Sequence, residues 1–182
     1  MKRYLDCSAS DLADIGKADL LYAIRASEGR ILVSETIAVT QPLLNNVTNA
    51  ELAASQGADL LLLNLFDVDH PHIAGLPADV SPQEALRTLQ RLTGRVIGVN
   101  LEAVDPAFAT EHNDFWQMTA GRAATAENAR KLYQLGARML VLTGNPNNGV
   151  SNQAIAAALK AIRDEVGDEM VLVTGKMHGA GI

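Results

Sequence analysis

Cysteine occurs only once among the 182 residues, as Cys7, so an internal disulfide is excluded and a reducing compartment is expected. The sequence also lacks an apolar run long enough for a membrane helix, and its first residues lack the apolar stretch of a signal peptide. Basic residues are scattered, and 15 Lys and Arg against 21 Asp and Glu give a formal net charge of −6. We therefore expect a cytoplasmic protein that binds neither nucleic acid nor an anionic membrane.

Hydrophobic residues, by contrast, make up 48% of the chain, which is enough for a sizeable core. The sequence contains no low-complexity segment or linker, so we expect a single domain over residues 1–182. A first helix is predicted from about residue 10 to residue 27, with an amphipathic face that Gly16 weakens.

A pattern of three parts then occurs five times: a glycine, a short apolar run, and a cluster of polar or ionisable residues. The glycines are spaced by 28 to 42 residues, the length of one strand, one helix and two short loops. Capping residues between them, such as Thr48 with Glu51, Thr125 and Ser151, mark helix starts. The predicted strands lie near residues 31–36, 59–64, 95–101, 138–143 and 169–175.

Nearly continuous apolar strands are typical of a parallel sheet that is buried on both faces by helical crossovers. Two α/β layouts fit this pattern, an open doubly wound sheet and a (β/α)8 barrel. We favour the (β/α)8 TIM-barrel type because polar clusters follow every strand. A doubly wound sheet concentrates such clusters at the point where the strand order reverses.

The chain is short for a complete barrel, which has eight units and about 250 residues. We therefore predict a partial barrel over residues 30–182, truncated after about five βα units. Its last strand would leave an exposed pairing edge. A homo-oligomer, or a partner that completes the open barrel, is expected to cover that edge.

Strand parity predicts which polar side chains meet at the carboxyl ends of the strands, because alternate residues share a face. The sets of equal parity are Asn100 with Glu102, Thr143 with Asn145, and Thr174 with Lys176 and His178. If these sets face inward, carboxylate, amide, ammonium and imidazole groups meet where barrel enzymes have their active sites.

From these clusters we predict two sets of site residues. The catalytic candidates are Lys176, Glu102, His178 and Glu35, and the substrate-binding candidates are Asn64, Asn100, Thr143 and Asn145. Lys176 suits a carbonyl or phosphate ligand, or an amine made nucleophilic by desolvation. A structural interpretation stays open for the charged candidates. Glu102 would then be a solvated loop carboxylate, Glu35 a capping carboxylate, and Lys176 the partner of an ion pair.

Asp67 and Glu102 are also candidate ligands of a divalent metal such as Mg²⁺, which prefers carboxylate oxygens. Asp67 and Asp69 with His70-Pro71-His72 form a second candidate metal cluster, and a solvated loop is its alternative. Residues 144–149 precede the predicted helix start at Ser151 and suit either an anion site or an ordinary Asn/Gly turn.

Several segments together resemble a known family. They are residues 5–11 (LDCSASD), 26–30 (ASEGR), 33–36 (VSET), 64–67 (NLFD), 98–102 (GVNLE), 143–146 (TGNP) and 175–182 (GKMHGAGI). On these motifs the whole chain resembles an uncharacterised bacterial TIM-barrel family, whose members are often labelled phosphoenolpyruvate phosphonomutase-like or haloacid-dehalogenase-like hydrolase. Members of that family continue beyond the last motif, so the resemblance also implies truncation.

The resemblance implies lyase or isomerase chemistry on a small anionic or phosphorylated metabolite. It also implies a link to sugar metabolism, because genes of the family lie near sugar-uptake phosphotransferase genes. A phosphonomutase-like enzyme would hold Mg²⁺ through Asp67 and Glu102 and use Lys176 or His178 as acid or base, although the Lys-Lys-Cys-Gly-His loop of that superfamily is absent.

Two alternatives to this function stay open. One is a non-catalytic barrel used for regulation or protein interaction. The other, less favoured, is a hydrolase of the haloacid-dehalogenase type, suggested by residues 65–69 (LFDVD). That superfamily expects a threonine two residues after the second aspartate, where this chain has Pro71.

Overall fold

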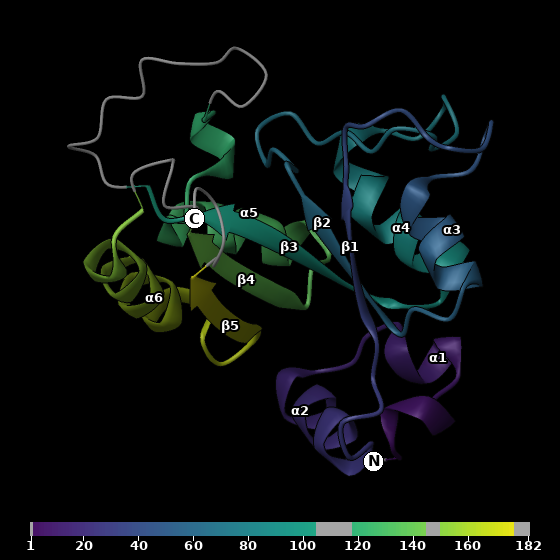
Figure 1. Ribbon diagram of the computed structural model, residues 1–182, viewed down its shortest axis with the longest axis horizontal. Coiled ribbons are helices and arrows are strands. Elements are labelled where there is room, and N and C mark those ends of the chain that lie inside the picture. Colours follow the sequence, from purple (N-terminus) through teal and green to yellow (C-terminus); the bar gives the residue numbers. More distant parts are fainter. Residues whose placement is uncertain (1, 105–117, 145–149, 177–182) are drawn as a thin grey trace, which may run out of the picture.

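The computed structural model describes residues 2–104, 118–144 and 150–176, with Lys176 described by its backbone. At its centre is a five-stranded parallel sheet whose strands lie side by side in the order of the sequence (Figure 1). The strands are β1 (Val33–Ile37), β2 (Leu60–Asn64), β3 (Val96–Glu102), β4 (Met139–Gly144) and β5 (Val171–Lys176). Since the strand order does not reverse, the prediction of a barrel-type α/β fold over a doubly wound one is confirmed.

Helices connect successive strands and cover one face of the sheet. They are α3 (Asn49–Ser55), α4 (Ala85–Thr93), α5 (Ala126–Leu135) and α6 (Asn152–Val166), with the short 3₁₀ turns η2 (Pro82–Glu84) and η3 (Ala120–Arg122) before α4 and α5. The side chains of Thr48, Thr125 and Ser151 cap α3, α5 and α6 as the sequence predicts. No helix in the described ranges is both long enough and apolar enough to cross a membrane.

The alternation of side chains divides the sheet into a helix-covered face and an inner face. On the helix-covered face, the main core contains Leu61, Leu63, Val99, Leu101, Leu140 and Leu142. On the inner face, a second core contains Leu60, Leu62, Val96, Met139, Val141 and Val171. Burial on both faces explains why the strands are nearly continuous apolar runs.

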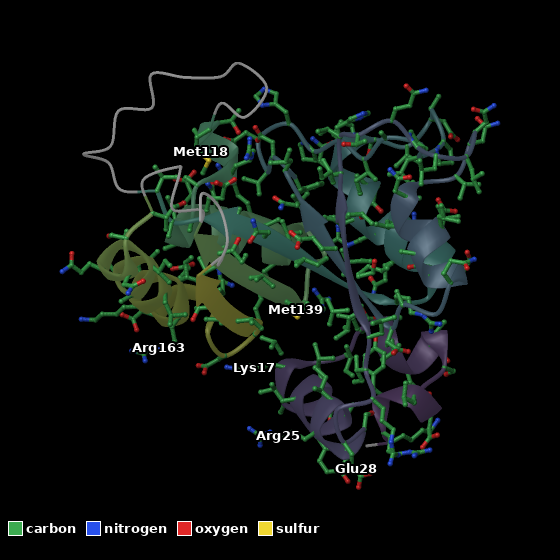
Figure 2. The ribbon with its side chains drawn as sticks, in the orientation of Figure 1. Lys17, Arg25, Glu28, Met118, Met139 and Arg163 are labelled. Atoms are coloured by element: carbon green, nitrogen blue, oxygen red, sulfur yellow. The ribbon has the colours of Figure 1, made fainter. Side chains whose placement is uncertain are left out.

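The N-terminal segment, purple in Figure 1, closes the amino end of the inner face. It consists of η1 (Tyr4–Asp6), α1 (Ala9–Leu12) and α2 (Lys17–Ala26). The Tyr4 hydroxyl donates to the carbonyl oxygen of Asp59 at 2.7 Å and accepts from the N–H of Val96 at 3.3 Å, and burial raises the pKa of Tyr4 to about 12. Lys17 of α2 donates to the carbonyl oxygen of Gly167, which ties α2 to the turn between α6 and β5 (Figure 2).

The prediction of a single N-terminal helix over residues 10–27 is wrong in one respect, because the chain forms two helices there. α1 begins at a capping box between Ser8 and Asp11, and α2 begins after Gly16, whose extended conformation (φ −78°, ψ 162°) breaks the helix. Glycine is a poor helix former because it loses the most backbone freedom on folding. The break allows Leu12 and Leu20 to pack into the same inner core.

β1 and β5 form the two edges of the sheet, and each pairs with a single strand among the described residues. Val33 of β1 and Val173 of β5 belong to the inner face, since they pair in register with Leu60 and Val141. They are 47% and 43% exposed, whereas Val96 in the middle of the sheet is fully buried. The inner face is therefore covered at its centre and open along both sides.

Candidate functional site

Four polar side chains form a hydrogen-bonded row across the inner face, near the carboxyl ends of β1 to β4. Asn64 Nδ2 donates to Glu35 Oε1 at 2.8 Å. Asn100 Nδ2 donates to Asn64 Oδ1 at 3.4 Å, and Thr143 Oγ1 donates to Asn100 Oδ1 at 2.6 Å. The structure thus brings four of the predicted site residues together, and we call Glu35, Asn64, Asn100 and Thr143 the polar row.

The strand register explains why these side chains meet. Glu35 pairs with Leu62, two residues before Asn64, and Asn100 pairs with Val141, two residues before Thr143. Diagonal neighbours on one face of a sheet lie within reach of polar side chains of this length. The first and last hydrogen bonds of the row therefore cross from strand to strand on the diagonal. Asn64 and Asn100 lie opposite each other, one residue beyond the pair of Leu63 and Val99.

The backbone fixes the orientation of both amides in the row. The N–H of Leu65 donates to Asn64 Oδ1 at 2.8 Å, and a backbone N–H can only donate. Asn64 therefore turns its Nδ2 toward Glu35, and Asn100 has to offer its own Nδ2 to Asn64 Oδ1. This leaves Asn100 Oδ1 to accept from Thr143. Donation consequently runs in one direction, from β4 to β1.

Exposure differs sharply along the polar row. Asn100 is only 4% exposed, Asn64 and Thr143 are half-buried, and Glu35 is exposed. The groups that a small molecule can reach are therefore the Glu35 carboxylate, the Asn64 amide and the Thr143 hydroxyl. Asn100 instead holds its two neighbours in a fixed orientation.

Glu102 is the last residue of β3, opposite Thr143 in register, and it forms a buried ion pair. Arg122 Nη2 donates to Glu102 Oε1 at 2.6 Å, and the two side chains are 8% and 11% exposed. The N–H of Ala124 donates to the carbonyl oxygen of Glu102 at 2.9 Å, which holds η3 beside the end of β3. Glu102 is thus not the solvated loop carboxylate that was left open as its structural alternative, because its side chain is buried and paired with Arg122.

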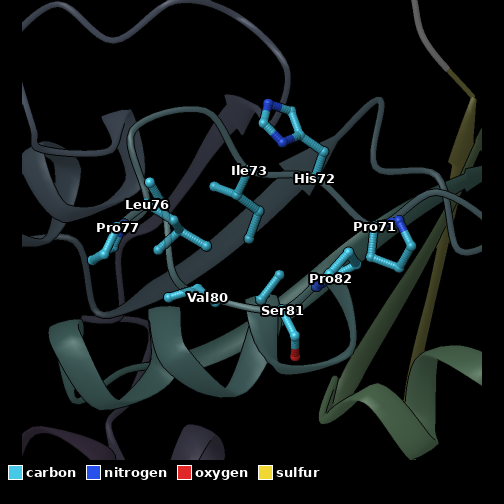
Figure 3. A pocket seen from close by; sticks show the side chains of 10 residues that line it. Pro71, His72, Ile73, Leu76, Pro77, Val80, Ser81 and Pro82 are labelled. Carbon is cyan, nitrogen blue, oxygen red and sulfur yellow. The ribbon is translucent and has the colours of Figure 1, made fainter.

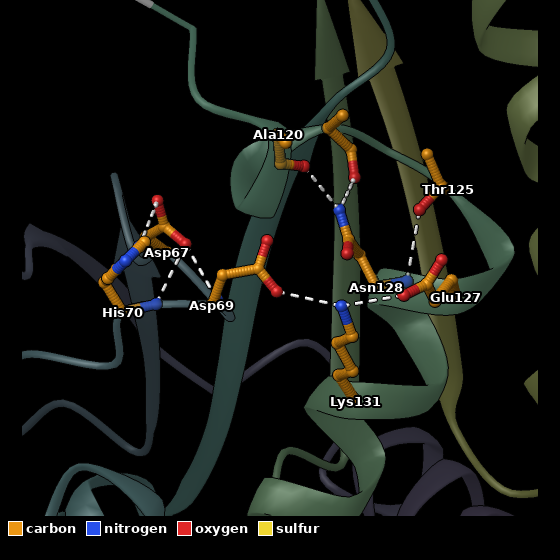
Figure 4. Close-up of polar contacts among 9 residues, drawn as sticks. Asp67, Asp69, His70, Ala120, Thr125, Glu127, Asn128 and Lys131 are labelled. Carbon is orange, nitrogen blue, oxygen red and sulfur yellow. Dashed lines mark hydrogen bonds and ion pairs between the residues drawn. The ribbon is translucent and has the colours of Figure 1, made fainter.

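Asp67 organises the loop after β2 and packs it against η3 (Figure 4). Its Oδ1 accepts from the N–H groups of Asp69 at 2.8 Å and His70 at 3.2 Å. A Cβ atom on Gly121 would lie 1.9 Å from the same oxygen, so the close packing requires glycine there. Burial raises the pKa of Asp67, but hydrogen bonds from the Thr119 side chain and the two N–H groups outweigh it and lower the pKa.

The neighbouring carboxylate, Asp69, is held by a cation. Lys131 of α5 lies 2.8 Å from Asp69 Oδ1 and 2.8 Å from Glu127 Oε1 (Figure 4). These two carboxylates raise the pKa of Lys131. The cluster therefore joins the β2–α4 loop to α5.

The predicted metal sites do not form within the described residues. No group of three or more His, Cys, Asp or Glu side chains there is placed to hold a metal ion. Arg122 occupies Glu102 Oε1, and two N–H groups occupy Asp67 Oδ1. Magnesium needs several free oxygen ligands in near-octahedral geometry. The described atoms of Asp67, Glu102, His70 and His72 therefore do not fit a Mg²⁺ site.

Lys176 ends β5, and its backbone pairs in register with Gly144. From parity we predicted that Lys176 and Thr174 lie on the same face of the sheet as the polar row. The register corrects this assignment, because Gly175 is the residue opposite Thr143. Sequence parity defines two sets in each strand but does not say which set faces inward.

Two further candidates, Asn145 and His178, lie outside the described residues. So does most of the predicted anion-binding turn, residues 145–149, although the helix that follows it does begin after Ser151. Their roles stay predictions.

Sequence reasoning missed two groups of the site, Arg122 and the N–H of Leu65. Arg122 is not part of a recognisable motif. It could have been found only by asking which cation pairs with Glu102, since a buried carboxylate needs one. Leu65 has a left-handed backbone (φ 57°), which costs a non-glycine residue about 1–2 kcal/mol. No feature of the sequence predicts a left-handed backbone at Leu65.

Two hollows lie away from the polar row. One, of about 160 Å³, lies between the loop after β2 and the start of α4 and is lined by Pro71, His72, Ile73, Leu76, Val80 and Pro82, among others (Figure 3). The other, of about 320 Å³, is an open, mostly apolar groove between β1 and α3, lined by Thr36, Ile37, Leu43 and Leu52, among others. Neither includes a residue of the polar row.

Comparison with protein families gives a match over residues 5–182, to the model described as "Domain of unknown function (DUF7916)". The chain belongs to this family. A comparison with curated proteins gave no match.

Among solved structures, one similar chain is a candidate fructose-1,6-biphosphate aldolase from Coccidioides immitis, with a TM-score of 0.47 and 16% sequence identity. The alignment covers 90% of this chain and 55% of that chain, so the present chain spans about half the length of the aldolase.

Proposed function

We propose that the carboxyl ends of the strands bind a small anionic or phosphorylated metabolite, and that the protein is a barrel enzyme of lyase or isomerase type. The polar row supports this proposal above all. Hydrogen-bonding side chains from four strands converge at the end of the sheet where barrel enzymes have their active sites. Sugar metabolism remains the proposed setting, in line with the family resemblance.

The described residues suit different roles in such a site. Glu35 is the accessible carboxylate of the row and is proposed as a general base. Asn64 and Thr143 are proposed as binding residues, and Asn100 as the residue that positions them. His178 and Asn145 keep their proposed catalytic and binding roles, whereas the register of β5 argues against a role for Lys176 in the polar row.

Two alternatives fit the described geometry less well. The haloacid-dehalogenase interpretation needs a free aspartate nucleophile, whereas Asp67 Oδ1 accepts two backbone N–H groups and Asp69 is paired with Lys131. A non-catalytic barrel would be favoured by a site filled with apolar side chains. The row instead consists of one carboxylate, two amides and a hydroxyl.

The proposed homo-oligomer or partner is supported by the open sides of the sheet. Val33 and Val173 are exposed on the inner face, and Leu43 beside β1 is 80% exposed. Light scattering coupled to size-exclusion chromatography measures the mass of the particle. A monomeric mass with no partner recovered would contradict this proposal.

Thermal unfolding with a panel of phosphorylated metabolites tests the binding proposal. At a ligand concentration of about 100 times Kd, binding adds roughly 2.7 kcal/mol to the stability. For a protein of this size that raises Tm by about 5–10 °C. No rise in Tm with any phosphorylated or carboxylated compound would overturn the proposal.

A matched pair of variants locates the binding site. Asn64→Ala removes a side chain from the polar row, whereas Asn49→Ala changes an asparagine at the start of α3, outside the row. We expect the Tm rise to fall to about half in Asn64→Ala, as for a Kd about tenfold higher, and to persist in full in Asn49→Ala. Glu35→Gln should keep the Tm rise but abolish turnover, because the amide cannot accept a proton from substrate.

A further inference from the structure

We infer that the part of the ligand lying on the polar row is a polyhydroxylated carbon chain, as in a sugar alcohol or sugar acid, and that its anionic group lies elsewhere. This inference rests on the proposed function and names the substrate class. It follows from the fixed direction of the hydrogen bonds in the row.

The first step concerns Thr143. Its hydroxyl proton is directed to Asn100 Oδ1 at 2.6 Å, because Asn100 Nδ2 is engaged by Asn64 Oδ1. A hydroxyl has one proton and two lone pairs. Toward a ligand, the oxygen of Thr143 can therefore only accept, and the ligand atom facing it has to be a donor.

The second step concerns Glu35, at the opposite end of the row. One carboxylate oxygen accepts from Asn64 Nδ2 at 2.8 Å, and an ionised carboxylate has no proton to donate. A ligand group beside Glu35 must also be a donor. A phosphate or carboxylate would meet repulsion there and would find no donor at Thr143.

The third step concerns Asn64, between them. Its Oδ1 accepts from Leu65 and Asn100, and one Nδ2 proton goes to Glu35. The second Nδ2 proton remains for an acceptor on the ligand. From β1 to β4, the accessible groups of the row thus accept, donate and accept.

A carbon chain that carries several hydroxyl groups matches this order. Hydroxyl groups donate to Glu35 and Thr143, and a hydroxyl or carbonyl oxygen accepts from Asn64. Neighbouring strands lie about 4.8 Å apart. A chain of about six carbons therefore has the length to reach more than one of these positions.

Two probes with the same phosphate and the same number of carbons test the inference, D-sorbitol 6-phosphate and hexyl phosphate. Isothermal titration calorimetry should give a Kd for sorbitol 6-phosphate at least about tenfold lower than that for hexyl phosphate. Equal affinities would overturn the substrate class while leaving the anion site standing. Binding of neither probe would overturn both proposals.

Thr143→Val tests the position of the hydroxyl acceptor. This variant keeps the shape of the side chain and should raise the Kd for sorbitol 6-phosphate about tenfold, while the Kd for hexyl phosphate stays unchanged. Thr143→Ser should retain the wild-type preference. Thr93→Val, which removes a hydroxyl bonded within α4, is the matched control and should change neither Kd. Equal weakening of both probes by Thr143→Val would overturn the assignment.

Asn100→Asp tests the direction of the row, with Asn100 as a positioning residue. Asp is nearly isosteric, but it cannot donate to Asn64 Oδ1, which the N–H of Leu65 holds in place, so two acceptor oxygens face each other and displace Asn64 from the row. We expect the preference for sorbitol 6-phosphate to fall about tenfold, with Kd for hexyl phosphate unchanged. A preserved preference in this variant would show that the row does not set the ligand class.

Discussion

The two ends of the inner face are built on the same strands and differ completely in chemistry. At the amino end, Leu60, Val96 and Met139 pack against the N-terminal segment and are at most 5% exposed. Four residues further along each strand, Asn64, Asn100 and Thr143 form the polar row. The apolar core and the proposed binding site are thus separated along the same strands, as in barrels whose carboxyl face carries the site.

Glycine at position 98 lies at the boundary between these two ends. A Cβ atom on Gly98 would lie 2.6 Å from Cε of Met139 and 3.3 Å from its Cβ, so glycine makes room for Met139 to fill the middle of the inner face. Figure 2 labels Met139 among the side chains near the sheet. Toward the carboxyl ends of the strands, the side chains of the polar row form hydrogen bonds with one another. These bonds allow a polar layer to lie next to an apolar core.

The largest expected effect would come from the polar end. Arg122→Met leaves the buried Glu102 carboxylate without the cation at its Oε1 and should lower the free energy of unfolding by about 3–5 kcal/mol. Urea denaturation followed by circular dichroism measures this loss. The double variant Arg122→Met/Glu102→Met should recover much of it, since both charges are gone. A loss below about 1 kcal/mol in the single variant would show that the pair is solvated.

A slightly smaller loss is expected at the apolar end. Leu20→Ala removes a fully buried side chain from the inner core and should cost about 2–5 kcal/mol. Leu92→Ala, at a side chain that is 49% exposed on α4, is the matched control and should cost far less. Binding of a phosphorylated ligand to folded Leu20→Ala should be unchanged. A loss of affinity there would break the separation of the two ends.

A third variant measures the polar contribution at the apolar end. Tyr4→Phe removes the hydroxyl that bridges Asp59 and Val96 and should lower stability by about 1–2 kcal/mol. Tyr22→Phe is the control, because Tyr22 is 55% exposed. Chemical denaturation of both variants gives the comparison. Equal effects would contradict the role of the buried hydroxyl.

The smallest effect concerns pH. The pKa of Asp67 is lower in the folded protein than its ordinary value of 3.8, so the ionised carboxylate stabilises the fold above that value. This contribution is lost as the pH falls below about 4 and through the folded pKa. Asp67→Asn should therefore show a shallower loss of stability between about pH 4 and pH 2 than the wild type. Parallel profiles would contradict it.

How far the sequence predicts this site depends on the residue. Asn64, Asn100 and Thr143 were identifiable because each ends or nearly ends an apolar strand, and parallel strands bring such positions to one edge. The inward set of β5 could not be identified, because residues 170–173 are all apolar and both parities therefore look equally suited to a covered face. Arg122 could not be foreseen as the partner of Glu102, since 20 residues separate them in the sequence.

The sequence by itself determined the parallel α/β architecture, the strand positions within about two residues, and the caps of α3, α5 and α6, because these depend on local periodicity and local hydrogen bonds. Tertiary structure alone decided the Glu102–Arg122 pair and the direction of the polar row. The direction depends on a single backbone N–H, that of Leu65, whose left-handed conformation is maintained by the surrounding fold. The ion pair and the bonds between the strands join segments that are distant in sequence, and their geometry exists only once the chain has packed.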